Sequence, residues 1–308
     1  MSRSSKLYFT QVVATPSGDA FLVGHALDQG SEPTFTRFAK AGDSGWVHLG
    51  DLGAVVYAAT AMPTPDSPRP SILALGREGP LRVFRPGEAP TDMPVTLKDK
   101  STYFESLCIA SDGIYICGGQ RQIAHRVNDN WSWVDQGLFT KFDGTNDCSL
   151  FSIVELVAGV LMVVGTRGFI AVREPANGWR QFDVGTNLDL HCAIAAGDGG
   201  AWICGDGGTL IRLKADRRSW VDESDRSLST HGFDSLALLK GTLYVTAFDK
   251  VLALELGKRL AAASSPIATG AEYHSLSAAG DFLWVTGDEH AYRFGPAGWN
   301  SFLCPDNL

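Results

Sequence analysis

A short segment recurs seven times along the chain, and this repeat constrains the fold more than any other feature. Each copy combines apolar and aromatic residues and ends in glycine or alanine, as in Ile114-Tyr-Ile-Cys-Gly118 and Ala201-Trp-Ile-Cys-Gly205. The final residues of the seven copies are Gly24, Gly76, Gly118, Gly165, Gly205, Ala247 and Gly287. They stand about 44 residues apart on average, so seven copies occupy the 308 residues without a spare domain.

The glycine-ending segment is one of four apolar segments in most repeats. A segment with a turn such as Asp112-Gly113 precedes it, a third such as 210–213 follows, and a fourth often carries tryptophan. Four short strands in about 44 residues are the period of a β-propeller blade. The sequence therefore predicts an all-β fold, with one seven-bladed β-propeller of four antiparallel strands per blade over residues 1–308. The blades are expected at residues 5–50, 51–98, 102–137, 147–184, 188–224, 232–265 and 272–304.

The glycine-ending strands are apolar on both faces, which is typical of strands that lie between neighbouring sheets. Cys117 and Cys204 share one repeat position with Val23 and Val164, so we expect both thiols in the core. None of the six cysteines forms a Cys-x-x-Cys pair, and a reduced protein is expected. The aromatic and large residues expected at equivalent buried positions are Phe21, Tyr115, Met162, Trp202, Tyr244 and Trp284.

The run Gly205-Asp-Gly-Gly-Thr-Leu-Ile-Arg212 resembles the Gly-x-x-Gly-x-Ile-x-Arg unit of bacterial propellers with neuraminidase-like or photosystem-II-assembly-factor-like repeats. Segments 165–173 and 76–82 are similar, with the arginine one place late or early. The resemblance implies a propeller, in a group made up mostly of scaffolds and binding platforms with some glycosidases. The neuraminidase-type box Ser-x-Asp-x-Gly-x-Thr-Trp is absent, which argues against a sialidase.

Charge and hydropathy exclude several function classes. A net charge of −8 argues against nucleic acid as a partner, because such proteins need a basic face. No segment approaches the 18 consecutive apolar residues that a membrane-spanning helix needs. Residues 1–6 are not followed by the apolar stretch of a secretory signal, so no such signal is expected. The motifs of serine hydrolases, zinc proteases and phosphate loops are missing. We therefore expect a cytoplasmic, monomeric protein without membrane contact or cofactor.

Polar residues recur at one position of the repeat. Glu105, Asp234 and His274 each stand thirteen residues before the final glycine or alanine, and each is followed by Ser-Leu. His191 takes this place in the fifth repeat, which has a slightly longer turn. The first strand of a propeller blade is innermost, so these side chains are expected around one mouth of the central channel. The aromatic residues expected in the flanking loops are Tyr103, Phe104, Phe233 and Tyr273.

These eight residues are the predicted partner-binding surface. Two plainer interpretations stay open: a solvated tunnel mouth for the polar residues, and packing between blades for the aromatic ones.

Three functions remain open from the sequence. The first is a non-catalytic protein-binding propeller of the bacterial cytoplasm, as an assembly scaffold or an immunity protein that neutralises a toxin, with one basic protein partner. The second is a carbohydrate-active hydrolase that would use Glu105, Asp234, His191 and His274 at the channel mouth. The third is a propeller that binds a metal ion or small ligand. The first hypothesis needs neither catalytic residues nor a metal.

Overall fold

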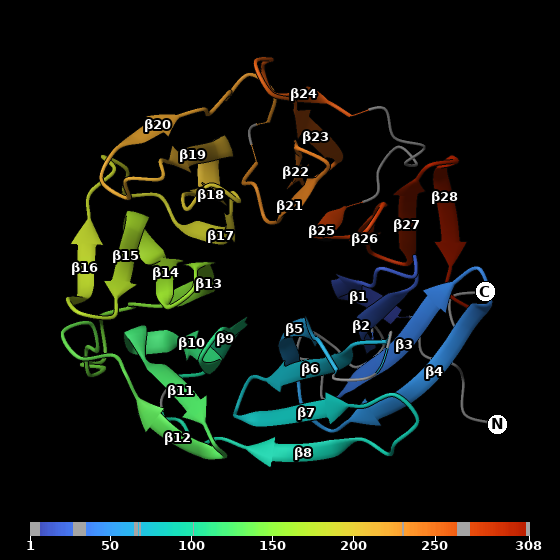
Figure 1. Cartoon of the computed structure of the whole chain (residues 1–308), viewed down its shortest axis with the longest axis horizontal. Coiled ribbons are helices and arrows are strands. Elements are labelled where there is room, and N and C mark those ends of the chain that lie inside the picture. Colours follow the sequence, from blue (N-terminus) through green and yellow to red (C-terminus); the bar gives the residue numbers. More distant parts are fainter. Residues whose placement is uncertain are drawn as a thin grey trace. The chain divides into compact units, whose positions relative to one another are not determined.

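The computed structural model describes residues 7–26, 35–64, 67, 69–100, 102–229, 231–263 and 272–305. These residues form seven sheets of four strands, so the predicted seven-bladed β-propeller is confirmed (Figure 1). Each sheet follows chain order, with every strand antiparallel to its neighbour. Residues 1–6, where the sequence predicts no secretory signal, lie outside the described part. No helix in the described residues is long and apolar enough to span a membrane.

The contacts divide the chain into two compact units. The first unit comprises Met1–Gly76, Arg82–Asp92 and Ser235–Leu308, and the second comprises Arg77–Leu81 and Met93–Asp234. Blades one, six and seven lie in the first unit, blades three to five lie in the second, and blade two is divided between them.

The strands of blades one, two, six and seven have the following bounds. Blade one has β1 (Leu7–Ala14), β2 (Ala20–Ala26), β3 (Thr36–Gly42) and β4 (Gly45–Leu52). Blade two has β5 (Val56–Met62), β6 (Ser71–Gly76), β7 (Pro80–Phe84) and β8 (Thr91–Pro94). Blade six has β21 (Leu236–Leu239), β22 (Thr242–Ala247), β23 (Lys250–Leu254) and β24 (Ala261–Ala262). Blade seven has β25 (Tyr273–Ala279), β26 (Phe282–Gly287), β27 (His290–Gly295) and β28 (Gly298–Leu303).

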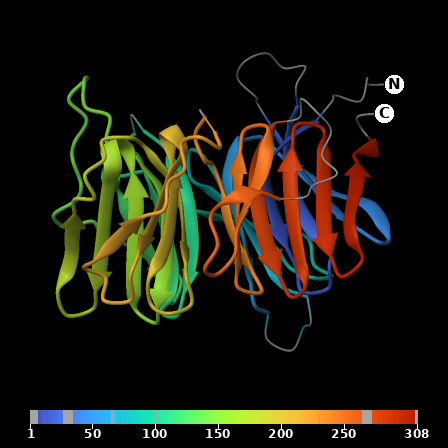
Figure 2. The same cartoon turned by 90° about the horizontal axis from the view of Figure 1, so that it is seen from above.

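Blades three to five form the second unit, where Figure 2 shows green and yellow strands of alternating direction. Blade three has β9 (Phe104–Ala110), β10 (Gly113–Gly118), β11 (Ile123–Val127) and β12 (Asn130–Trp133). Blade four has β13 (Leu150–Val157), β14 (Val160–Gly165), β15 (Phe169–Glu174) and β16 (Gly178–Phe182). Blade five has β17 (Leu190–Ala195), β18 (Ala201–Gly205), β19 (Thr209–Leu213) and β20 (Trp220–Asp222). Single 3-10 turns η2 (Gly119–Arg121), η3 (Thr166–Gly168) and η4 (Asp206–Gly208) join the second and third strands.

The second strand of each blade supplies most of the core. Every residue of β2, β6 and β14 is buried, because sheets pack against both faces of these strands. Phe21, Tyr115, Met162 and Trp284 are buried as predicted. Trp202 and Tyr244 were also expected to be buried, and this prediction is wrong because both are half-buried. The Trp202 ring lies 5.2 Å from the Arg212 guanidinium, and the Tyr244 ring borders a pocket at the surface of blade six.

The two thiols predicted in the core are fully buried, and all six cysteines are free. Burial raises the pKa of both Cys117 and Cys204 well above the usual value. These cysteines therefore act as small apolar residues.

A β-bulge recurs at the start of the first strand and explains the glycine position. In β17, Leu190 pairs with Gly205 and Cys192 pairs with Cys204, so His191 is an extra, unpaired residue. The same register shift occurs in β1, β5, β9, β13 and β25, where the bulge residues are Thr10, Tyr57, Glu105, Phe151 and His274. The polar repeat position found in the sequence is therefore the bulge position.

A serine links neighbouring blades; it follows the bulge in blades three, four and seven and takes the same repeat position in blade six. The hydroxyl oxygen of this serine accepts a hydrogen bond from a main-chain N–H in the first strand of the next blade. That N–H group has no acceptor among the strands of the sheet to which it belongs. The pairs within each unit are Ser106 with Ile153 (3.3 Å), Ser152 with Ala193 (3.2 Å), Ser235 with Leu276 (3.0 Å) and Ser275 with Val12 (3.2 Å). The serine of the Ser-Leu motif thus has a structural role.

Blade seven packs against blade one without sharing a strand. The Trp284 indole N–H donates to the Gly18 carbonyl oxygen at 3.2 Å. Arg293 donates to the same carbonyl at 3.1 Å and pairs with Asp43 at 2.6 Å. Segment 252–263, which has a helix-favouring composition, forms β23 and β24 as its place in the repeat predicts.

Candidate functional site

In six of the seven blades, the bulge turns one side chain of the first strand out of the regular alternation of the sheet. Three of the four polar residues predicted as a site stand at this position: Glu105, His191 and His274. Each is half-buried, whereas Asp234 is exposed and precedes β21. Glu105, His191 and Asp234 belong to the second unit and His274 to the first, so their surroundings are described separately.

Glu105 is a half-buried carboxylic acid of the second unit. Burial raises the pKa of its carboxyl to about 7, the Arg77 guanidinium opposes this rise, and the Asp147 carboxylate adds to it. The carboxyl therefore changes its charge near neutral pH. The Arg77 guanidinium lies 4.0 Å from the Tyr103 ring centre, which makes a cation–π contact with this half-buried aromatic residue.

His191 is held by two neighbours of the second unit. Its Nε2 lies 2.8 Å from Asp206 Oδ1, and its ring centre lies 5.5 Å from that of Phe151. Phe151 is the bulge residue of blade four, so the bulges of adjacent blades place these rings in contact.

Three of the four aromatic residues expected in surface loops lie in the core instead, and that expectation is wrong. Phe104, Phe233 and Tyr273 are fully buried. Phe104 and Tyr273 pair with the glycines that end the second strands, directly before the bulge, and so point into the blade. Of the predicted aromatic contacts, only Tyr103 is even partly accessible.

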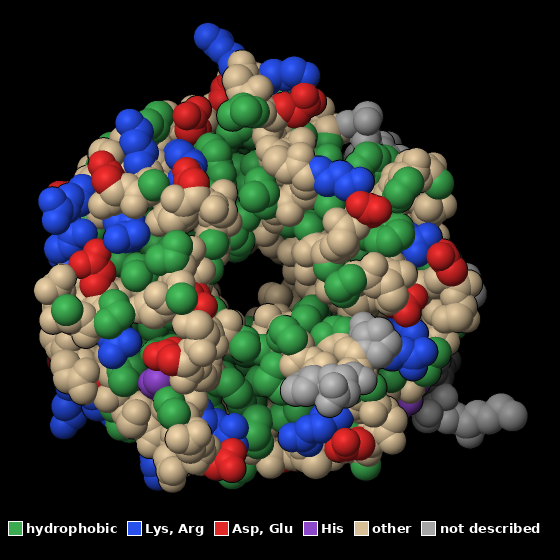
Figure 3. Space-filling model, in the orientation of Figure 1, with side chains coloured by type: hydrophobic (Ala, Val, Ile, Leu, Met, Phe, Trp, Pro, Cys, Tyr) green, Lys and Arg blue, Asp and Glu red, His purple; other side chains and the backbone are tan. Residues whose placement is uncertain are grey.

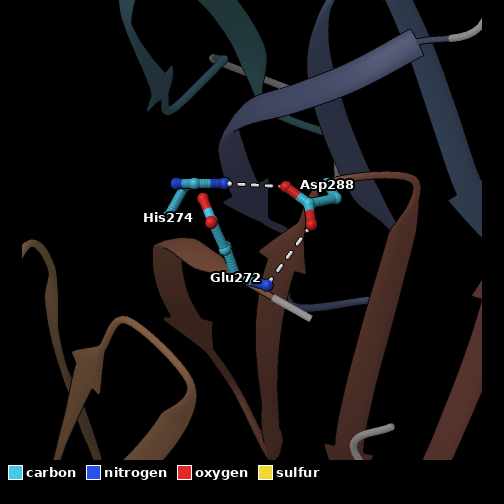
Figure 4. Close-up of side chains that lie close together, drawn as sticks. All are labelled: Glu272, His274 and Asp288. Atoms are coloured by element: carbon cyan, nitrogen blue, oxygen red, sulfur yellow. Dashed lines mark hydrogen bonds and ion pairs between the residues drawn. The ribbon is translucent and has the colours of Figure 1, made fainter. Parts of the chain in front are cut away.

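His274 belongs to a group of chemically complementary side chains in the first unit (Figure 4). Its Nε2 lies 3.4 Å from Asp288 Oδ1, and its Nδ1 lies 3.3 Å from the Tyr8 hydroxyl. The Glu272 N–H donates to Asp288 Oδ2 at 3.3 Å. One ligand atom each from Glu272, His274 and Asp288 lies within 4.8 Å of the others.

Glu272, Asp288 and Tyr8 were not predicted as site residues from the sequence. A signal was present, because an aspartate follows the final glycine in both blades that carry histidine at the bulge, as Asp206 and Asp288. An acid also stands two residues before each histidine, at Asp189 and Glu272.

Charged side chains of both signs are interspersed on the face shown in Figure 3. Several charged side chains of the protein form ion pairs, as Arg82 does with Asp92 at 2.7 Å and Arg212 with Asp198. Such exposed pairs contribute little to stability and keep the surface polar.

No family model matches the chain. Over 192 residues the chain is 29% identical to the immune protein Tsi7 of Pseudomonas aeruginosa, which covers 61% of this chain. The chain spans about 60% of the length of this curated relative.

The solved structures that resemble the chain are propellers. YCF48 from Cyanidioschyzon merolae has a TM-score of 0.67 and 14% identity, over 99% of this chain and 97% of its own. YCF48 bound to D1 peptide has a TM-score of 0.61 and 12% identity, over 80% and 81%. The WD40 β-propeller domain of Doa1 has a TM-score of 0.65 and 11% identity, over 92% and 90%. These similarities establish the fold, and YCF48 confirms the expected resemblance to photosystem-II-assembly-factor-like propellers.

Proposed function

We propose that this protein is a non-catalytic, protein-binding propeller that acts as an immunity protein in the bacterial cytoplasm by binding and neutralising a toxin. The observation that carries the proposal is the 29% identity to the immune protein Tsi7 over 192 residues. The similarity to YCF48 with a bound D1 peptide supports the coarser part, because it is a propeller of this kind holding a polypeptide.

The partner surface is proposed on the second unit, at Tyr103, Glu105, His191 and Asp234. All four side chains are at least partly accessible. Glu105 and His191 stand in β9 and β17, and Tyr103 and Asp234 shortly precede β9 and β21. A rigid scaffold lowers the entropy that is lost when such a surface binds a partner. Phe104 and Phe233, which are buried in the second unit, do not contact the partner in this proposal.

The proposed partner is a single basic protein bound by a monomer of this chain. The net charge of −8 favours an oppositely charged partner. Attraction of this kind raises the association rate and weakens as salt is added.

The proposal is tested by expressing the products of the neighbouring genes, alone and together with this chain, and measuring growth. We expect that one product is toxic, that this chain restores growth, and that the two purified proteins bind. If this chain relieves the toxicity of no neighbouring product and binds none of them, the proposal fails.

A matched pair of charge reversals then tests the surface. Asp234→Lys should slow association with the partner about tenfold, whereas Glu223→Lys should change it little. Both residues are exposed acids of the second unit, so each variant changes the net charge equally. If both variants change the association rate equally, the proposed surface is wrong. The immunity function would still be tested by the growth assay.

A further inference from the structure

We propose that Glu272, His274 and Asp288 in blade seven form a binding site for a divalent transition-metal ion such as Zn²⁺. All three residues belong to the first unit, and none of them is part of the proposed partner surface. Among the described residues, these three form the one group of His, Cys, Asp and Glu side chains whose ligand atoms converge within 4.8 Å.

The donors suit this class of ion. Zn²⁺ binds imidazole nitrogen and carboxylate oxygen at about 2.0–2.2 Å, so two donors of one ion lie roughly 3–4 Å apart. His274 Nε2 and Asp288 Oδ1 already lie 3.4 Å apart. Small rotations of the Glu272 side chain would complete a three-ligand set. An imidazole in the set favours Zn²⁺ over Ca²⁺ and Mg²⁺, which prefer oxygen ligands alone.

The backbone holds the three ligands in place. Glu272 and His274 flank the fully buried Tyr273, which pairs with Gly287, and Asp288 follows that glycine directly. The Asp288 carbonyl accepts the Phe9 N–H at 2.8 Å, and the Tyr273 N–H donates to the Phe248 carbonyl at 2.7 Å. The ligands therefore stand on ordered main chain, as a preformed site requires.

Tyr8 orients the imidazole. A metal-binding histidine usually donates its second ring N–H to an oxygen, which fixes the tautomer and the ring position. The Tyr8 hydroxyl lies 3.3 Å from His274 Nδ1 and can accept that N–H, which leaves the lone pair of Nε2 directed toward the carboxylates. The access that a metal ion needs is also present, because the His274 side chain is 21% exposed and that of Asp288 is 37% exposed.

Blade five provides a comparison within the same chain. Asp189, His191 and Asp206 occupy the repeat positions of Glu272, His274 and Asp288, and the second histidine–aspartate pair is also formed, at 2.8 Å. Asp189 Oδ1, however, accepts the Arg167 N–H at 2.8 Å. The Asp189 carboxylate therefore binds the main chain and does not join the pair of His191 and Asp206. A His191 variant is for this reason the matched control.

The test is a ZnCl₂ titration of the chelator-treated full chain in competition with a chromophoric chelator. We expect one ion bound per chain at this site in the wild type and in His191→Ala. His274→Ala should weaken that binding by about 100-fold, and Glu272→Gln and Tyr8→Phe by about tenfold each. Circular dichroism of each variant checks that the fold is retained.

Co²⁺ separates this site from the free thiols. Bound by one imidazole and two carboxylates, Co²⁺ should show visible d–d absorption without a thiolate-to-metal charge-transfer band, and His274→Ala should abolish it. Zn²⁺ affinity that is the same in His274→Ala as in wild type, or an equal loss in His191→Ala, would overturn the proposal. Neither outcome bears on toxin neutralisation, which growth measures.

Discussion

At the scale of single residues, the glycine that ends the second strands is required by space and not by backbone conformation. Gly165 has a φ of −174°, which any residue adopts. A Cβ at this position would lie 2.0 Å from the Ser149 carbonyl oxygen and 3.0 Å from Leu150 Cα. The bulge of the first strand brings that backbone close. The repeat glycine and the bulge are therefore two parts of one local structure.

Replacing this glycine should be costly. Gly165→Ala should lower the free energy of unfolding by about 1–3 kcal/mol, because backbone atoms must move to admit the methyl group. Gly53→Ala is the control, since nothing lies within 4 Å of its added Cβ. Urea denaturation measures both variants, and equal stability of the two would show that the bulge can move away without cost.

Glu105 should make stability depend on pH. The folded-state pKa of about 7 lies above the ordinary value of 4.5, so between these values the folded protein holds a proton that the unfolded chain has released. Stability should therefore fall as the pH rises from about 4.5 to 7 and level off above that window.

Glu105→Gln should remove this part of the pH dependence and raise stability at pH 8 by roughly 1–3 kcal/mol. Chemical denaturation at several pH values from 5 to 8 measures it, with Glu223→Gln as the exposed control. An unchanged slope in Glu105→Gln would mean that its carboxyl is ionised throughout this range.

At the scale of strands, the serine after the bulge links sheets that share no strand. Ser152 and Ala193 are both buried, so the Ala193 N–H would lose its partner if the hydroxyl were removed. Ser152→Ala should lower the free energy of unfolding by about 1–3 kcal/mol. Ser132→Ala, on the exposed strand β12, should be nearly neutral. Thermal unfolding compares the two variants, and a neutral Ser152→Ala would mean that water replaces the hydroxyl.

The strands could be predicted from the sequence more fully than the side-chain directions. The spacing of the repeat glycines and the turn residues indicated the strands, because the four strands and the turns of one blade follow one another directly in the sequence. The bulge breaks the alternation of a strand, so the same pattern did not show that Phe104 and Tyr273 point inward. Glu272 and Asp288 escaped because their approach depends on two strands of one blade, which no local motif records.

At the scale of the whole molecule, the repeats share one framework and differ in the side chains that it carries. The bulge position holds Thr10, Tyr57, Glu105, Phe151, His191 and His274 in different blades, although the main chain around it is the same. Composition and period predict that framework. They do not identify a partner, because residues that different repeats contribute to one surface form no contiguous motif. The similarity to the immune protein Tsi7 extends over 192 residues and is a property of no single motif.

The framework also predicts a gradient of local stability within every blade. In blade five, β18 is hydrogen-bonded to strands on both sides and is largely buried, whereas β20 pairs with β19 alone and is exposed throughout. Local opening is easiest where few buried contacts oppose it. Amides of β18 should therefore exchange with solvent deuterium at least about 100-fold more slowly than those of β20. Blade six should show the same order, with β22 protected and the exposed two-residue β24 exchanging first. Hydrogen exchange followed by mass spectrometry resolves these segments, and equal protection of second and fourth strands would mean that each blade opens only as a whole.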